Sequence, residues 1–192
     1  MKILVISQYF YPENFKINDI ILGLKSQGHE LTVLTGKPNY PYGKFFSEYS
    51  FFTKNFELWN GIKIYRSPLF TRGKGSGLRL FMNYISFAFF ASVRQLFIKE
   101  SFDKIFVYQP SPITVGFPAI VAKNRFKAPI YFWVQDLWPE SLSAAGGINN
   151  SIVLNLADLI TKYIYKNSKK IFVQSKAFIP YLNKQNVKPE KI

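Results

Sequence analysis

The 192-residue chain contains no cysteine and a single histidine, His29. The absence of cysteine excludes a disulfide framework, a thiolate metal site and a cysteine nucleophile. One histidine cannot form a cluster of imidazole ligands or more than one member of a His-dependent triad. Metal chemistry would have to depend on carboxylates, and we predict no metal site.

Long apolar runs are also missing. The longest charge-free apolar region, residues 80–93, has 14 residues, whereas a membrane-spanning helix needs about 20. The apolar part of the N-terminus is too short for a secretory signal, because the polar pair Ser7-Gln8 follows at once. We therefore expect a cytoplasmic protein with no segment that crosses a bilayer.

Acidic residues are scarce: 11 stand against 25 basic ones, which gives a net charge of +14. None lies between Glu57 and Glu100, whereas basic residues accumulate there. Such a field attracts the phosphates of nucleic acid, of anionic lipid or of a phosphorylated substrate. No pattern of a nucleic-acid-binding module is present, so we expect no nucleic-acid partner.

Glycine-rich phosphate-binding motifs are lacking as well. The first strand is followed by Ser-Gln-Tyr-Phe-Tyr-Pro-Glu-Asn at residues 7–14, without the glycines that let a dinucleotide approach the helix. Residues 72–77 are glycine-rich, but they lack the preceding strand and the Lys-Ser/Thr pair of a P-loop. The sequence argues against a nicotinamide or flavin enzyme, and we expect no cofactor in this domain.

What the chain does show is a regular alternation of strand and helix patterns. We predict strands at residues 2–7, 30–35, 56–59, 62–66, 103–108, 130–135 and 170–174, and helices at 15–27, 78–98, 114–124, 152–166 and 176–184. Asn60-Gly61 suits a type I′ hairpin turn, and Gly146-Gly147 marks a break before the fourth helix. The pattern predicts an α/β fold with a Rossmann-like, mostly parallel sheet and helices on both faces.

The segment at residues 128–140 is the most informative. The apolar run 130–134 leads directly into Asp136 and Glu140. In open α/β sheets ligands bind beyond the carboxyl ends of the strands, so we predict Asp136 as a catalytic residue that binds substrate hydroxyls or acts as a general base. Capping of a helix is the alternative for Asp136. Glu140 is either a substrate-binding residue or a first-turn residue favoured by the helix dipole.

Two further strand ends carry polar side chains that we expect in the same crevice. We predict that these side chains bind substrate: Gln8, Glu13, Asn14 and Asn18 after the first strand, and Gln109 and Ser111 after the strand at 103–108. For Asn14, helix capping is an equal alternative. The tips of Gln8, Gln109 and Asp136 are expected along one open rim.

The helix at 78–98 is apolar around most of its circumference. It either lies in the core or rests with its aromatic side in a lipid headgroup layer. The basic residues at and before its start favour contact with membrane or phosphate groups; they are Arg66, Arg72, Lys74 and Arg79.

Several segments resemble the N-terminal half of family 4 retaining glycosyltransferases, which have the GT-B fold. They are residues 7–14, 28–36, 38–41, 108–112 and, most specifically, Trp-Val-Gln-Asp-Leu-Trp-Pro-Glu at 133–140. The closest subgroup is that of bacterial capsule and O-antigen enzymes similar to N-acetyl-L-fucosamine transferases. The resemblance covers essentially the whole chain.

The resemblance implies that residues 1–192 form a single acceptor-side domain. A C-terminal domain, absent from these residues, would bind the nucleotide-diphosphate sugar, so this chain alone is expected to be inactive. A lipid-linked saccharide would be the acceptor, on the inner face of the bacterial membrane, with the protein docked there peripherally. Asp136 stands where many relatives have a histidine that meets the transferred sugar. Pro12-Glu13-Asn14 replaces a glycine pair near the donor phosphates.

The alternative hypothesis, from a different functional class, is a non-catalytic domain. Such a domain would bind a phosphorylated ligand or an anionic membrane through the same basic residues. The scarcity of acids fits both readings.

Overall fold

The computed structural model describes residues 1–144 and 148–192, and it contains one seven-stranded sheet in the order β3-β4-β2-β1-β5-β6-β7. The predicted break at Gly146-Gly147 lies outside the described residues. All neighbouring strands pair in parallel except β3 and β4, which form an antiparallel hairpin. The predicted Rossmann-like, mostly parallel sheet is confirmed.

The strands and helices lie close to the predicted ranges. The strands are β1 (Lys2–Ile6), β2 (Glu30–Gly36), β3 (Phe56–Trp59), β4 (Ile62–Ser67), β5 (Lys104–Gln109), β6 (Ile130–Val134) and β7 (Lys170–Val173). The α-helices are α1 (Ile17–Ser26), α2 (Gly77–Arg94), α3 (Gly116–Phe126), α4 (Glu140–Ala144), α5 (Ser151–Asn167) and α6 (Ile179–Lys184). Short 3-10 helices are η1 (Gln95–Phe97), η2 (Ile113–Val115), η3 (Lys176–Phe178) and η4 (Pro189–Lys191).

Local sequence explains where several elements begin and end. The two residues of the β3–β4 turn have positive φ, 49° at Asn60 and 72° at Gly61, as a type I′ turn requires. Gly28, with φ 83°, follows α1 and lets the chain reverse into β2. The central strands are apolar on both sides, because helices cover both faces of the sheet.

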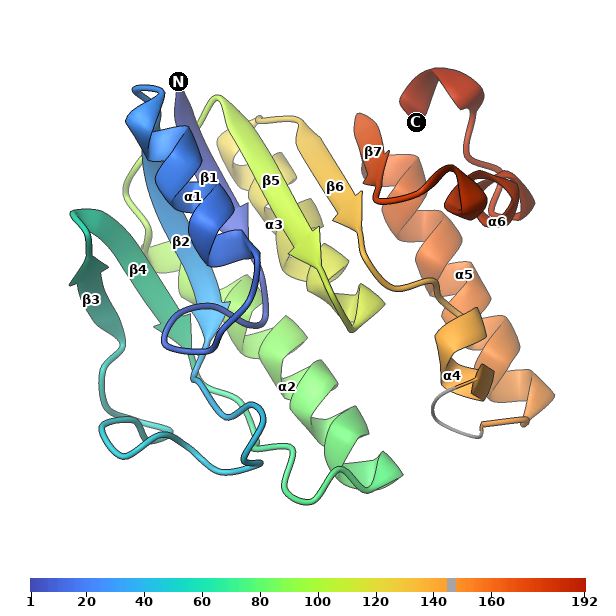
Figure 1. Cartoon of the computed structure of the whole chain (residues 1–192), viewed down its shortest axis with the longest axis horizontal. Coiled ribbons are helices and arrows are strands. Elements are labelled where there is room, and N and C mark those ends of the chain that lie inside the picture. Colours follow the sequence, from blue (N-terminus) through green and yellow to red (C-terminus); the bar gives the residue numbers. More distant parts are fainter. Residues whose placement is uncertain (145–147) are drawn as a thin grey trace.

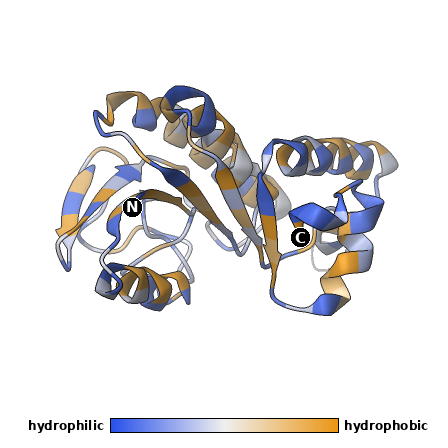
Figure 2. Cartoon of the chain, turned by 90° about the horizontal axis from the view of Figure 1, so that it is seen from above, coloured by the Kyte–Doolittle hydropathy of each residue, from blue (hydrophilic) through white to orange (hydrophobic). Residues whose placement is uncertain are grey.

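The helices form two layers. In Figure 1, α1 lies in front of the sheet and α2, α3 and α5 lie behind it; the view from above in Figure 2 shows the same arrangement. The larger core fills the space between the sheet and the α2, α3 and α5 layer, and includes Phe87, Ile120 and Ile164. The smaller core packs α1 onto the other face through Ile17 and Ile21.

This topology fixes the direction of every strand end. The parallel strands point downward in Figure 1, so their carboxyl ends form the lower edge of the sheet. The helices that follow run in the opposite direction and begin at that edge. Loops with polar side chains therefore gather at the lower edge, where the candidate site lies.

Candidate functional site

The structure brings the ends of β1, β5 and β6 together, because these strands are neighbours in the sheet. Gln8 follows β1, Gln109 ends β5, and Asp136 follows β6. The backbone N–H of Gln135 donates to the carbonyl of Gln109 at 3.1 Å, which ties two of these ends. The three predicted side chains thus occupy one sheet edge.

The side chains of Gln8 and Gln109 are buried at this edge. Gln8 Nε2 donates to Asn83 Oδ1 of α2 at 2.7 Å, and Asn83 Nδ2 donates to the carbonyl of Phe70 at 2.6 Å. Both amide atoms of Gln109 are buried and have no hydrogen-bond partner among the described residues. The expected open rim is therefore corrected: Gln8 and Gln109, 1% and 0% exposed, form a buried polar floor, and Asn83 of α2 lies against Gln8.

Asp136 remains half-buried and partly open to solvent. Its Oδ2 accepts a hydrogen bond from the indole Nε1 of Trp138 at 3.1 Å. Burial raises the pKa of Asp136, and the neighbouring Trp138, Ser111 and Ser141 side chains oppose that rise. The hydrogen bond given by Trp138 comes from its side chain and not from a backbone amide, so it does not cap α4.

Next to Asp136 lies a group of buried polar atoms without partners in the described part of the chain. It includes Glu140 Oε2, Ser141 Oγ and the Tyr165 hydroxyl. Burial raises the pKa of Tyr165, and the charges of Glu140 and Asp136 raise it further. Glu140 also occupies the first turn of α4, as its alternative interpretation predicts. Unpaired buried polar atoms suit a site that a polar ligand completes.

Glu13 has a different role from the one predicted. Its carboxylate is 2% exposed and accepts three backbone N–H groups, from Phe10 at 3.2 Å, Asn39 at 2.8 Å and Tyr40 at 2.7 Å. Burial raises the pKa of Glu13 to about 7, against the effect of these donors. The expectation of direct substrate contact does not fit this burial, because both oxygens join the loops after β1 and β2.

The two asparagines that follow β1, Asn14 in the loop and Asn18 in α1, also differ from one another. Asn18 Oδ1 accepts from the Tyr11 amide at 3.1 Å, and its Nδ2 donates to the Glu13 carbonyl at 2.8 Å, so it braces the loop. Asn14 is exposed. It does not cap α1, since that helix has Lys16 as its N-cap residue and no side-chain cap. Asn14 therefore stays available for a ligand.

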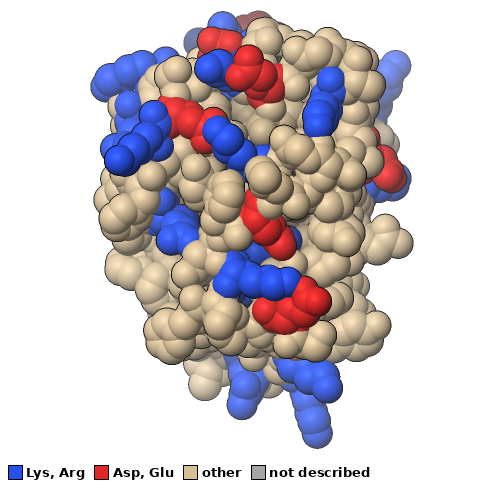
Figure 3. All heavy atoms as spheres, turned by 90° about the vertical axis from the view of Figure 1, so that its left-hand side faces the viewer, with Lys and Arg blue, Asp and Glu red and all other residues tan. Residues whose placement is uncertain are grey.

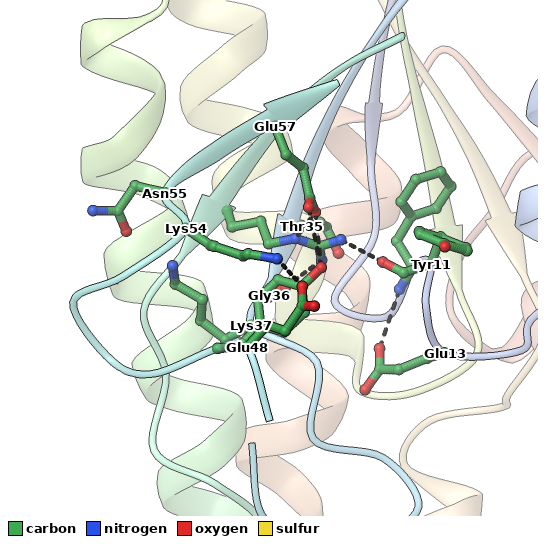
Figure 4. Close-up of polar contacts among 12 residues, drawn as sticks. Tyr11, Glu13, Thr35, Gly36, Lys37, Glu48, Lys54, Asn55 and Glu57 are labelled. Carbon is green, nitrogen blue, oxygen red and sulfur yellow. Dashed lines mark hydrogen bonds and ion pairs between the residues drawn. The ribbon is translucent and has the colours of Figure 1, made fainter. Parts of the chain in front are cut away.

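The prediction that Arg66 contacts membrane or phosphate groups is wrong. Its side chain is fully buried and pairs through Nε with the carboxylate of Glu57. Nη1 donates to the Gly36 carbonyl at 3.2 Å, and Nη2 donates to the Tyr11 carbonyl. Figure 4 shows Glu57, Gly36 and Tyr11 around this network. Arg66 is internal because it satisfies carbonyl groups where three segments meet.

The other three predicted basic residues lie nearer to solvent. Arg72 is half-buried, with its guanidinium carbon 4.9 Å from the centre of the Tyr40 ring. Lys74 and Arg79 are exposed. In Figure 3, acidic and basic side chains mix over most of the face at the β3 edge, whereas only basic ones project from its lowest part. Positive charge thus gathers at the end that carries the site.

Sequence reasoning missed several residues of this edge. Asn83, Trp138 and Tyr165 all belong to it, yet they come from three separate segments. A lone asparagine within an apolar helix was the one available signal, because a buried amide needs a partner. Within residues 1–144 and 148–192, no group of three His, Asp or Glu side chains could hold a metal.

Comparison with known proteins agrees with this fold. The model of the glycosyl transferase 4-like domain matches residues 16–192. The chain therefore belongs to this family of glycosyltransferase domains. No curated protein matches it.

Two solved structures share the fold at low sequence identity. Sucrose-phosphate synthase from Thermosynechococcus elongatus is 14% identical with a TM-score of 0.61, over 95% of this chain and 44% of that one. The catalytic domain of starch synthase IV from Arabidopsis thaliana, bound to ADP and acarbose, is 15% identical with a TM-score of 0.53, over 88% and 43%. This chain thus spans less than half the length of either structure.

Proposed function

We propose that this chain is the acceptor-side domain of a retaining glycosyltransferase that uses a nucleotide-diphosphate sugar. The observation that carries the proposal is Asp136, a half-buried carboxyl at the end of β6 in a domain of the glycosyl transferase 4-like family. One similar structure is described as bound to a nucleotide, ADP, and a saccharide, acarbose. These ligands support a nucleotide and a saccharide as the two kinds of ligand here.

In this proposal Asp136 orients a hydroxyl of the transferred sugar or of the acceptor. Its Oδ2 accepts a hydrogen bond from the Trp138 indole, and a carboxylate has further lone pairs that can accept a hydrogen bond from a sugar hydroxyl. Burial raises the pKa of Asp136, and perturbed carboxyls of this kind are common at functional sites. Ser111 lies beside Asp136 and Glu140 beside Tyr165, and in this proposal both side chains, together with Asn14, contact the substrates above the buried amides of Gln8 and Gln109.

A second domain is part of the proposal. It would bind the donor and close over the lower edge of the sheet, so the 192 residues alone would not transfer sugar. We further propose a lipid-linked saccharide as acceptor, in the assembly of capsule or O-antigen polysaccharide, with the protein docked on the inner face of the membrane. The basic residues Arg72, Lys74 and Arg79 support contact with diphosphate or headgroups.

Nucleotide release tests the proposal. A polypeptide that joins this chain to its downstream domain is expected to release nucleotide from a nucleotide sugar when a polyprenyl-diphosphate-linked saccharide is present. The 192-residue chain alone, as matched control, is expected to release none. Binding of phosphorylated ligands or vesicles by the longer polypeptide, with no release from any nucleotide sugar, would instead favour the non-catalytic domain.

A further inference from the structure

The outward face of α2 is apolar. Its large exposed side chains recur every three or four residues and so share one face: Leu78, Phe81, Met82, Ile85, Phe89 and Val93. Leu78, Phe81 and Phe89 are 74%, 57% and 61% exposed. The buried residues Asn83, Phe87 and Ala91 are four apart and lie on the opposite face. An ordinary surface helix presents polar residues outward, and α2 does not.

Helix α5 also presents apolar side chains to solvent, which the sequence did not lead us to expect. Ile152, Leu156, Leu159 and Tyr163 are 76%, 58%, 63% and 50% exposed at helical spacing. The core side of this helix carries Ala157, Thr161, Ile164 and Tyr165 instead. Two helices far apart in sequence thus expose apolar ridges. Scattered exposed apolar residues are normal, but continuous ridges of this kind mark interaction surfaces.

Both ridges belong to one layer of the molecule. α3 contacts α2 on one side and α5 on the other, behind the sheet (Figure 1). The opposite face offers an internal comparison: α1 has one large exposed apolar residue, Leu22, at 36%. The apolar exterior is therefore a property of the α2–α3–α5 layer and not of the helices in general.

The charge of this layer is mainly positive. Its three helices carry six basic residues, Arg79, Arg94, Lys123, Arg125, Lys162 and Lys166. Their one acidic residue is Asp158, whose carboxylate is 2.7 Å from the Lys162 ammonium group. Of the six, Arg79, Arg125 and Lys166 are exposed, whereas Asp158 is half-buried. Helices that combine exposed apolar ridges with exposed basic residues are typical of the headgroup region of an anionic bilayer.

We propose that the apolar ridges of α2 and α5 together dock this protein on an anionic lipid surface, with both helices lying along it. The inference rests on the proposed function, because a lipid-linked acceptor requires the enzyme at the membrane. α2 begins at the carboxyl edge of the sheet, and its Tyr84 ring lies 6.4 Å from the Trp138 ring beside Asp136. Docking through this layer would place the site next to the headgroups.

Vesicle binding tests the contribution of α5 directly. The chain is mixed with vesicles of phosphatidylglycerol and phosphatidylcholine, and its co-sedimentation is measured for the wild type and for Leu156→Gln/Leu159→Gln. An exposed leucine that enters the interface loses its apolar contact with lipid, so we expect at least about tenfold weaker binding. Phe81→Ser/Phe89→Ser on α2 is expected to weaken binding equally. Leu22→Gln on α1 is the matched control and is expected to bind like the wild type.

Three further measurements make the outcomes distinct. Binding of the wild type should fall as salt rises and should vanish on pure phosphatidylcholine. Wild-type binding by the α5 variant would overturn the proposal, as would a wild-type dimer that the α5 substitutions convert to monomers in size-exclusion chromatography. In the longer polypeptide that includes the downstream domain, transfer of sugar to a water-soluble acceptor, with release of nucleotide, is expected to survive both helix variants. Its absence from the wild type as well would count against the proposed function and not against the docking surface.

Discussion

Glu13 is a carboxylate that the fold holds away from water while three backbone amides donate to it. Burial raises its pKa from 4.5 to about 7, so between these values the folded state binds a proton that the unfolded chain has lost. Stability should therefore fall as pH rises through this window. The full effect of such a shift is roughly 3 kcal/mol.

The pH dependence of unfolding checks this directly. Urea midpoints of the wild type and of Glu13→Gln are compared between pH 4.5 and pH 8. The wild type is expected to lose stability across this range relative to the variant, which has no titrating group at that position. Parallel profiles for the two proteins would show that Glu13 is ionised in the fold throughout.

Arg66 is a buried charge whose removal is expected to destabilise the fold. Its guanidinium group serves the Glu57 carboxylate and the carbonyls of Gly36 and Tyr11. Arg66→Met would leave these acceptors without their donor, and we expect a loss of about 3 kcal/mol or more in the free energy of unfolding. Chemical denaturation measures the change.

Lys54→Met is the matched control for Arg66, because Lys54 also pairs with a carboxylate, that of Glu48, but at the surface. Water already solvates such a pair, so no measurable change is expected. Equal losses for the two variants would contradict the assignment of Arg66 to an internal network.

At the scale of single elements, one glycine in the β3–β4 hairpin and one in α1 are expected to respond in opposite ways to substitution by alanine. Gly61 has φ 72° in the hairpin turn, a conformation that side chains with Cβ rarely adopt. Gly23 lies within α1, and an added Cβ there would meet no atom within 4 Å. Gly61→Ala is expected to destabilise the chain by about 1 kcal/mol. Gly23→Ala is expected to stabilise it by a similar amount, since alanine favours helix.

Thermal unfolding of the two glycine variants gives melting temperatures on either side of the wild-type value. Destabilisation by Gly23→Ala, or an unchanged melting temperature for Gly61→Ala, would contradict the local geometry. Both positions lie far from the candidate site, so ligand binding should not change.

The strands and helices could be predicted from the sequence because their signals are local. Helical spacing, the Asn60-Gly61 pair and the glycine after α1 each act within a few residues, and the structure confirms them. The roles of Arg66 and Glu13 could not be predicted. An arginine that is buried looks like an exposed one in sequence, and its partners, such as Tyr11 and Gly36, come from other segments.

Only part of the candidate site could be predicted, because only part of it follows from local signals and the fold class. Neighbouring strand ends follow from the fold class, so the positions of Gln8, Gln109 and Asp136 at one edge could be inferred. The burial of Gln8 could not, because it depends on Asn83 of α2, which is distant in sequence. Tyr165 comes from a helix whose pattern gives no sign of a site.

On the scale of the whole molecule, two surfaces meet at the lower edge of the sheet. The candidate site lies at the ends of β5 and β6, and the α2–α3–α5 layer begins beside it. A reaction between a water-soluble donor and a lipid-linked acceptor needs this adjacency, since one substrate remains in the membrane. In the proposed transferase, the strand ends would contact the substrates and the apolar layer would hold the protein at the membrane.

The most direct test is acceptor-dependent nucleotide release by the longer polypeptide, measured for the wild type and for Asp136→Asn alongside their melting temperatures. We predict that Asp136→Asn lowers turnover by about tenfold to a hundredfold, because a hydrogen bond to a charged group is lost. The melting temperature should stay near the wild-type value, and Glu30→Gln, at the opposite edge, should change neither. Undiminished turnover by Asp136→Asn, or an equally large loss of stability, would contradict the placement of the reacting centre at Asp136.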